Sequence, residues 1–243
     1  MSDLPYSTIV VSGDDAFGFL QAQLAADLGV LTSADPSYVL SEPASDVIPA
    51  TTLLSAWCNP KGRVIALFRV AKQNEEYLLT FPTELSDEVL KRLTLFRFRA
   101  KVEFEAQDAT NAQLGIGNSF DEWRLDNLRA GIPEIPGSLS EEFTPHMLNL
   151  DLLDAVSVDK GCYPGQEIVA RTHFRGATKR RCLRFESTTP VSPGDKVSDG
   201  ERDVGEVLNA IGNDILAVVP VAKADESLTV GGVALLHLPL PYL

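Results

Sequence analysis

The segment KGCYPGQEIVARTHFRG, residues 160–176, sets a cysteine directly before a stretch with the pattern of a helix. We expect Pro164 in the first helical position, where its missing N–H costs nothing. Glu167 then lies near the positive end of the helix dipole, and Arg171 follows at a spacing that favours a side-chain pair. Gly176 is a typical residue to end such a helix. The rest of the chain is interpreted around this helix and the cysteine at its start.

Cys162 is the residue of this segment with the most distinctive chemistry. In the predicted geometry it lies just outside the helix N-terminus, near Lys160 and within reach of Arg171 or Arg175. A helix N-terminus and nearby cations both stabilise a thiolate relative to a thiol. A free cysteine is otherwise among the most commonly buried residues and behaves as a small hydrophobe. Two interpretations therefore stay open, a reactive thiolate and a packed core residue.

The pattern K-G-C-Y-x-G-Q-E, followed by I-V-A-R and F-R-G, resembles the signature of the YgfZ family, folate-binding relatives of the glycine cleavage system T-protein. His146 stands in a stretch similar to the family's F-x-P-Q-x-x-N-L, at the position where glutamine is usual. The stretches that extend the resemblance are an opening strand and helix at 11–27, a P-K-G-R turn at 59–63, an R-x-G-I-P region at 123–133 and the F-x-P stretch at 143–150. Most of the chain is thus covered, and its C-terminal portion is the least distinctive.

The resemblance implies a folate-binding accessory protein with tetrahydrofolate as its ligand. It further implies a role in the assembly or repair of iron–sulfur clusters in target enzymes, with an indirect effect on tRNA modification. Cys162 is then the reactive residue, flanked by Lys160 and Tyr163. The residues expected to bind the folate are Gln166, Glu167, Arg171, Arg175, Arg129, Lys61 and Arg63. A lone thiol can supply one ligand to iron but cannot hold a cluster, so a partner enzyme or assembly protein must share any cluster contact.

Composition limits the class of protein. With 243 residues, 44% of them apolar, the chain can form one or two folded domains. No apolar run approaches the length of a membrane-spanning helix, and residues 1–5 carry neither a basic region nor an apolar signal core. The three cysteines are widely spaced and the three histidines scattered, so we expect no disulfide framework and no self-contained metal site. A monomer in a reducing cytoplasm is the simplest expectation.

The formal net charge of −13 weighs against direct nucleic-acid binding, which depends on Lys and Arg neutralising phosphates. Five basic residues nevertheless crowd into residues 171–181. A solvated face, a site for a small anion such as the glutamate tail of folate, and an RNA-contacting surface all fit this cluster. An RNA surface would show salt-sensitive binding to tRNA.

Periodicity predicts an α+β fold in which helices cover one face of a mostly antiparallel sheet. The expected strands are 8–12, 53–57, 63–71, 76–81 and 101–106, and the expected helices are 17–28, 86–98 and 121–129. Residues 31–52 have the composition of a loop-rich passage. From residue 181 onward, short strands expected at 182–186, 204–210, 215–221 and 233–236 alternate with turns, which is typical of a small β-barrel or sandwich. We therefore expect a T-protein-like folate-binding domain at 1–178 and a C-terminal β-barrel domain at 179–243.

A folate-dependent aminomethyl or methyl transferase, like the T-protein itself, is the second interpretation. That chemistry needs a carboxylate at the folate nitrogen. In T-protein relatives an aspartate follows the glycine turn closely, whereas residues 63–69 contain no acid. A nucleophile pair of Cys162 with His173 or His146 is a further alternative, although no third orienting residue stands out. Whether the protein turns over a substrate stays open on the sequence.

Overall fold

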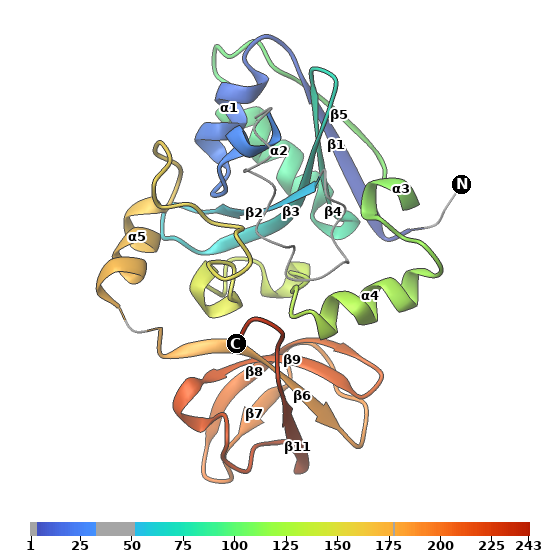
Figure 1. Cartoon of the computed structure of the whole chain (residues 1–243), viewed down its shortest axis with the longest axis vertical. Helices are drawn as coiled ribbons and strands as arrows, with labels where there is room; N and C mark the ends of the chain where they lie inside the picture. Colours follow the sequence, from blue (N-terminus) through green and yellow to red (C-terminus); the bar gives the residue numbers. More distant parts are fainter. Residues whose placement is uncertain (1–3, 33–51, 177) are drawn as a thin grey trace.

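The computed structural model describes residues 4–32, 52–176 and 178–243, which form a five-stranded antiparallel sheet and a closed barrel (Figure 1). The strands of the sheet, in spatial order, are β2 (Thr52–Cys58), β3 (Val64–Gln73), β4 (Glu76–Pro82), β1 (Tyr6–Ser12) and β5 (Glu103–Asp108). β3 and β4 form a hairpin, turning at Asn74, whose φ of 55° suits a tight turn.

Both faces of this sheet are covered. The described helices are α1 (Ala16–Gln23), α2 (Ser86–Phe96), α3 (Asn111–Leu114), α4 (Phe120–Arg129) and α5 (Gln166–Arg175). In β2, Leu53 and Trp57 pack into the core with α1 and α2, whereas Leu54 and Ala56 pack on the opposite side with residues 128–163. The expectation of helices on one face was therefore incomplete. Every residue of β2 is buried, so this strand shows no polar face that could have revealed the second layer.

The barrel confirms the predicted C-terminal β structure. Its strands are β6 (Arg180–Ser187), β7 (Lys196–Ser198), β8 (Asp203–Ile211), β9 (Asp214–Pro220), β10 (Thr229–Val230) and β11 (Val233–Leu238), closed by pairing of β10 with β7. The sequence did not predict β7 and β10, because strands of two and three residues are too short to show a period. Cys182 and Val218 of the barrel share a core with Leu148 and Leu150 of the preceding part. The division into domains at residue 178 stays a prediction.

Two predicted helices begin or end elsewhere. α5 starts at Gln166 rather than at Pro164, because Gly165 takes the N-cap position with a φ of +81°. α1 ends at Gln23, and Leu24 then forms a β-bridge with Trp57, so tertiary contact overrides the helical spacing. Of the loop-rich passage predicted at 31–52, residues 33–51 lie outside the described residues. Short 3-10 turns complete the fold at Leu28–Leu31, Thr83–Leu85, Gly137–Leu139, Pro145–Leu148 and Val221–Lys223.

Candidate functional site

Cys162 is exposed and lies beside an open hollow of about 450 Å³. Val158, Gln166 and Ala170 are among the residues that line this hollow with it. The other two cysteines of the chain are buried, and burial raises the pKa of each of their thiols to about 12. The interpretation of Cys162 as a packed core residue is therefore wrong.

Two glycines hold the cysteine loop against the turn between β2 and β3. Gly165 has a φ of +81°, and a Cβ there would lie 2.5 Å from the Asn59 carbonyl oxygen and 2.7 Å from the Gly62 Cα. Gly62 has a φ of +69°, and a Cβ there would lie 2.9 Å from Cβ of Ile168. Both positions combine a left-handed backbone with a contact that leaves no room for a side chain. The P-K-G-R turn and the cysteine motif, about one hundred residues apart in the sequence, are thus packed together.

The β2–β3 turn is itself braced by the side chain of Asn59. Its Oδ1 accepts hydrogen bonds from the backbone N–H of Lys61 at 2.9 Å and of Arg63 at 3.0 Å, while its Nδ2 donates to Glu141. Arg63 donates to the carbonyl of Glu142. The turn is therefore rigidly tied to residues 141–142, and it presents Lys61 to solvent.

The Lys160 amine points into the protein. Its Nζ donates to the backbone carbonyls of Leu24 and Ala26, at 2.7 Å each, and lies 5.6 Å from the centroid of the Tyr163 ring. Burial lowers the pKa of Lys160 to about 8, although the nearby Asp27 carboxylate opposes that shift. Lys160 thus anchors the start of the loop, a role that the sequence did not predict.

Tyr163, the residue after the cysteine, is 5% exposed and belongs to the core. Its hydroxyl has no hydrogen-bond partner in the part of the chain that the structure describes. Burial raises the pKa of this phenol well above its usual range, with the neighbouring Cys58 adding to the effect. Tyr163 belongs to the core and also lines the hollow beside Cys162.

The structure brings together some of the predicted folate-binding residues. Gln166 and Glu167 line the hollow, and Gln166 Nε2 donates to the Lys160 carbonyl at 3.2 Å. Glu167 pairs with Arg171 at 2.7 Å on the exposed side of α5, as the spacing predicted. Arg129 instead pairs with Asp214 of the barrel at 3.0 Å. As folate ligands, Gln166, Glu167, Arg171, Arg175, Arg129, Lys61 and Arg63 remain a prediction.

The basic cluster at 171–181 is largely occupied by internal contacts. Arg181 forms a two-pronged ion pair with Asp151, with both N···O distances at 2.9 Å, and also donates to the His146 carbonyl. Arg180 donates to the Val218 carbonyl at 3.2 Å. Together with the Arg171 pair, these contacts favour a structural role for most of the cluster over an RNA-contacting one.

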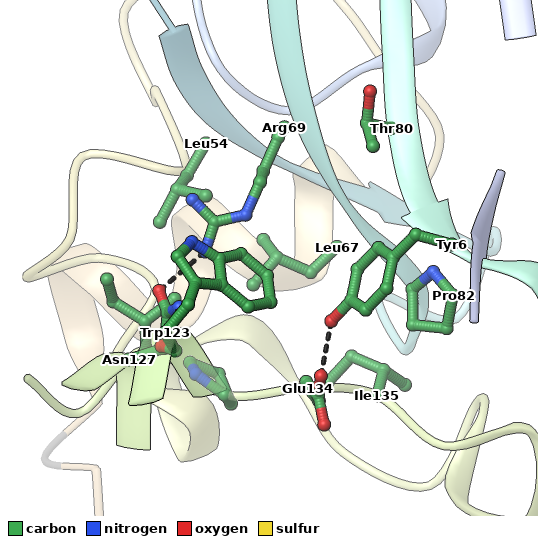
Figure 2. A pocket seen from close by; sticks show the side chains of 12 residues that line it. Tyr6, Leu54, Leu67, Arg69, Thr80, Pro82, Trp123, Asn127, Glu134 and Ile135 are labelled. Carbon is green, nitrogen blue, oxygen red and sulfur yellow. Dashed lines mark hydrogen bonds between the residues drawn. The ribbon is translucent and has the colours of Figure 1, made fainter. Parts of the chain in front are cut away.

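A second site, which the sequence did not predict, lies between the sheet and α4 (Figure 2). The Arg69 guanidinium is buried over the Trp123 ring, 4.8 Å from its centroid, and donates to Asn127 Oδ1 at 2.6 Å. Its Nη1 has no hydrogen-bond partner within the described ranges. Burial lowers the pKa of Arg69. The free space here is about 20 Å³, enough for one water molecule. The available signal was a single arginine inside the apolar strand VIALFRVA.

Tyr6 and Glu134 close this inner cavity on its outer side. The Tyr6 hydroxyl donates to Glu134, which also pairs with Arg124 at 2.9 Å. Burial raises the pKa of Tyr6 well above its usual range, and the Glu134 charge raises it further. Beyond this closure lies a groove of about 320 Å³, bounded by β4, Arg124 and Asn209 of the barrel. The cavity and the Cys162 hollow lie near different parts of β2, since Leu54 in the strand lines the cavity and Pro60, beyond the end of the strand at Cys58, lines the hollow.

Comparison with known proteins found similar proteins that match most of the chain. The family model "CAF17, C-terminal beta-barrel domain" matches residues 179–240. An uncharacterized protein of Haemophilus influenzae is 29% identical over 217 residues, covering 76% of this chain and 72% of that protein. The tRNA-modifying proteins YgfZ of Vibrio vulnificus and Klebsiella pneumoniae are 25% and 26% identical, covering 89% and 85% of this chain and 85% and 79% of their own. The chain is similar to the YgfZ proteins over most of its length.

A solved structure extends the YgfZ comparison to the T-protein. The glycine cleavage system aminomethyltransferase T from Bartonella henselae matches with a TM-score of 0.68 at 14% identity, covering 98% of this chain and 84% of that one. At this identity the match establishes a shared fold. The predicted T-protein-like α+β architecture is confirmed. No helix in the described ranges is long and apolar enough to cross a membrane.

His146, the departure from the YgfZ motif, is a buried residue. It is 2% exposed, and neither ring nitrogen has a hydrogen-bond partner among the residues that the structure describes. Its ring centroid lies 6.0 Å from that of His173. Burial lowers the pKa of His146. Neither imidazole lines the Cys162 hollow, so the structure does not support a Cys–His nucleophile pair.

Proposed function

We propose that this protein is a folate-binding accessory factor in tRNA modification, and that it acts on iron–sulfur enzymes through the Cys162 thiol. The curated YgfZ relatives are named as tRNA-modifying proteins, and the aminomethyltransferase T shares the fold. The observation that carries the proposal is the exposure of Cys162 on a loop that two interlocked glycines hold in place. A loop held in one conformation can present the Cys162 thiol to a partner protein in a fixed position.

The chemistry proposed for Cys162 is limited to what one thiolate can do. It supplies a single soft ligand to an iron atom while the client enzyme retains the other cluster ligands. Pro60 of the β2–β3 turn and the start of α5 form the rim of the hollow beside this sulfur. An open rim suits contact with another protein better than enclosure of a small molecule.

The folate is proposed to occupy the groove that ends at Tyr6 and Glu134. Its volume of about 320 Å³ lies within the range of ligand pockets, and it is more enclosed than the Cys162 hollow. The pterin ring stays in the groove, because the inner cavity has room for only one water molecule. In the groove it would meet Tyr6, the Arg124 guanidinium and the Glu134 carboxylate.

Titration of the purified protein with tetrahydrofolate tests this location. Arg124→Ala, at the groove, is expected to weaken binding, because it removes the cation paired with Glu134. Lys223→Ala is the control, since Lys223 forms ion pairs with Asp199 and Glu226 in the barrel and lines neither the groove nor the Cys162 hollow. Alkylation of Cys162 should leave the affinity unchanged. Loss of binding on alkylation, or through Gln166→Ala, would instead assign the folate to the Cys162 hollow.

Complementation of a bacterial strain that lacks its own YgfZ protein tests the cellular role. The amount of modified tRNA nucleosides is measured by mass spectrometry. Cys162→Ser is expected to abolish the rescue, whereas Cys58→Ala, which removes a buried thiol, should retain it if the variant folds. Full rescue by Cys162→Ser would reject the proposed thiol chemistry.

One observation bears on the second candidate, a folate-dependent aminomethyl or methyl transferase. The acid missing from residues 63–69 has a counterpart in Glu134, which reaches the same cavity from another segment. Glu134 is engaged by Tyr6 and Arg124, so it is not free to manage protons in this state. Turnover of an aminomethyl donor in the presence of tetrahydrofolate would favour the transferase.

A further inference from the structure

The loop between α2 and β5 exposes an aromatic ring between cations. Its sequence, residues 97–101, is RFRAK. Phe98 is 85% exposed, and Leu95 in the preceding helical turn is 70% exposed. Phe98 has a φ of +46°, a left-handed backbone conformation that a bulky side chain rarely adopts. An unusual backbone that keeps a large apolar ring in water calls for a functional explanation.

The exposure does not come from a frayed loop, because the backbone is braced at both ends. The N–H of Ala100 donates to the Arg97 carbonyl at 2.9 Å. The N–H of Lys101 donates to Asp15 Oδ2 at 2.8 Å, and the N–H of Asp15 donates back to the Lys101 carbonyl at 3.3 Å. A Cβ on Gly13 would lie 2.2 Å from that same carbonyl oxygen, so the β1–α1 turn packs tightly under the loop. The Phe98 ring is thus presented by a fixed turn.

The charges around Phe98 are available to a ligand. Within the described ranges, Arg97 and Arg99 form no ion pair, although Arg97 Nη1 donates a long hydrogen bond to the Val102 carbonyl at 3.4 Å. The Lys101 pair with Asp14, at 3.2 Å, is exposed. Arg181 of the cluster at 171–181, by contrast, is held by a largely buried ion pair with Asp151. An open hollow of about 570 Å³ lies beside the loop, between it and the turn at 12–14. Figure 1 places this end of β1 and β5 away from the barrel.

We propose that the loop at residues 97–101 is a contact site for an unpaired base of an RNA. An exposed aromatic face flanked by cations stacks on a base while the cations bind the adjacent phosphates. Asp14 and Glu103, which line the same hollow, can accept hydrogen bonds from base amino groups. The choice of RNA as the partner rests on the proposed role in tRNA modification.

The geometry sets the size of the effects. Three cations give a slope of about −2 for the logarithm of affinity against the logarithm of salt concentration, since single strands contribute about −0.7 per neutralised phosphate. Raising the salt from ~50 to ~200 mM should therefore weaken binding about twenty-fold. Loss of stacking in Phe98→Ala should weaken binding about five-fold or more.

Fluorescence anisotropy of the full chain with labelled oligouridine and with unmodified tRNA tests the site. Phe98→Ala and Arg99→Ala should both weaken binding. Phe174→Ala is the matched control, because Phe174 is a 68% exposed ring beside the cations of α5. Phe174→Ala should bind RNA as tightly as the protein without substitutions. Phe98→Ala should have the same melting temperature and tetrahydrofolate affinity as that protein.

Three outcomes would overturn the assignment. The first is that no RNA binds at low salt. The second is that Phe98→Ala and Phe174→Ala lose the same amount of RNA affinity. The third is that phosphatidylserine vesicles bind the same loop and displace the RNA. Complementation separates this inference from the proposed function. If tRNA modification still depends on Cys162 while RNA binding is absent, the RNA site is wrong and the accessory function stands. If RNA binds as expected but Cys162→Ser still supports modification, the thiol chemistry fails and the RNA site stands.

Discussion

Replacing Gly165 with alanine tests whether the cysteine loop is locked to the β2–β3 turn. An L-residue in the left-handed region at a φ of +81° costs about 1–2 kcal/mol. The added methyl would also lie 2.5 Å from the Asn59 carbonyl oxygen, and such overpacking costs about 1–3 kcal/mol. Alanine also reduces the flexibility of the unfolded chain, which offsets about 0.4–1 kcal/mol of this loss of stability. The net expectation is a loss of about 3 kcal/mol, or a melting temperature lower by about 6–12 °C.

Alanine substitutions at two other glycines separate the cost of the left-handed backbone conformation from the cost of the close contact. A Cβ on Gly161, in the same loop, meets no atom within 4 Å, so Gly161→Ala should stay within about 0.5 kcal/mol of the unmodified protein. Gly200 has a φ of +92° in open space, so Gly200→Ala measures the cost of the backbone conformation alone. Urea and thermal unfolding followed by circular dichroism give all three values. If Gly165→Ala is no less stable than Gly200→Ala, the two motifs are not in close contact and the packing argument fails.

Three further outcomes are expected. A charged alkylating reagent should modify one thiol per native chain, at Cys162, and should reach the two buried cysteines only after unfolding; mass spectrometry showing a second native adduct would contradict this. Burial lowers the pKa of Lys160 in the folded protein to about 8, against an ordinary value of 10.5. Between these two values the unfolded chain binds more protons, so stability should rise with pH relative to Lys160→Met. Urea unfolding at a series of pH values would contradict this expectation if the stability difference between the two proteins did not change across that range. Arg181→Ala should cost about 3 kcal/mol, because it leaves the Asp151 carboxylate largely buried without its partner; a loss below about 1 kcal/mol in urea unfolding would show that the pair contributes little.

Local patterns in the sequence were sufficient for much of the fold. Residue period and turn composition predicted all five strands of the sheet and the four longest strands of the barrel. The spacing of Glu167 and Arg171 predicted an ion pair that the structure contains. Such features depend on residues near one another in the chain, so they can be derived before the fold is known. α1 shows the limit, because contact between Leu24 and Trp57 ends a helix that the spacing would continue.

The sequence by itself determined the architecture and singled out Cys162 as the residue to examine. Only the tertiary structure decided that this thiol is exposed, that the Lys160 amine turns inward, and that Gly62 packs against Gly165. It also gathered Tyr6, Arg69, Trp123 and Glu134 from four separate segments into one cavity. The physical reason is that burial and hydrogen-bond partners are set by residues far apart in the chain, which no local pattern records.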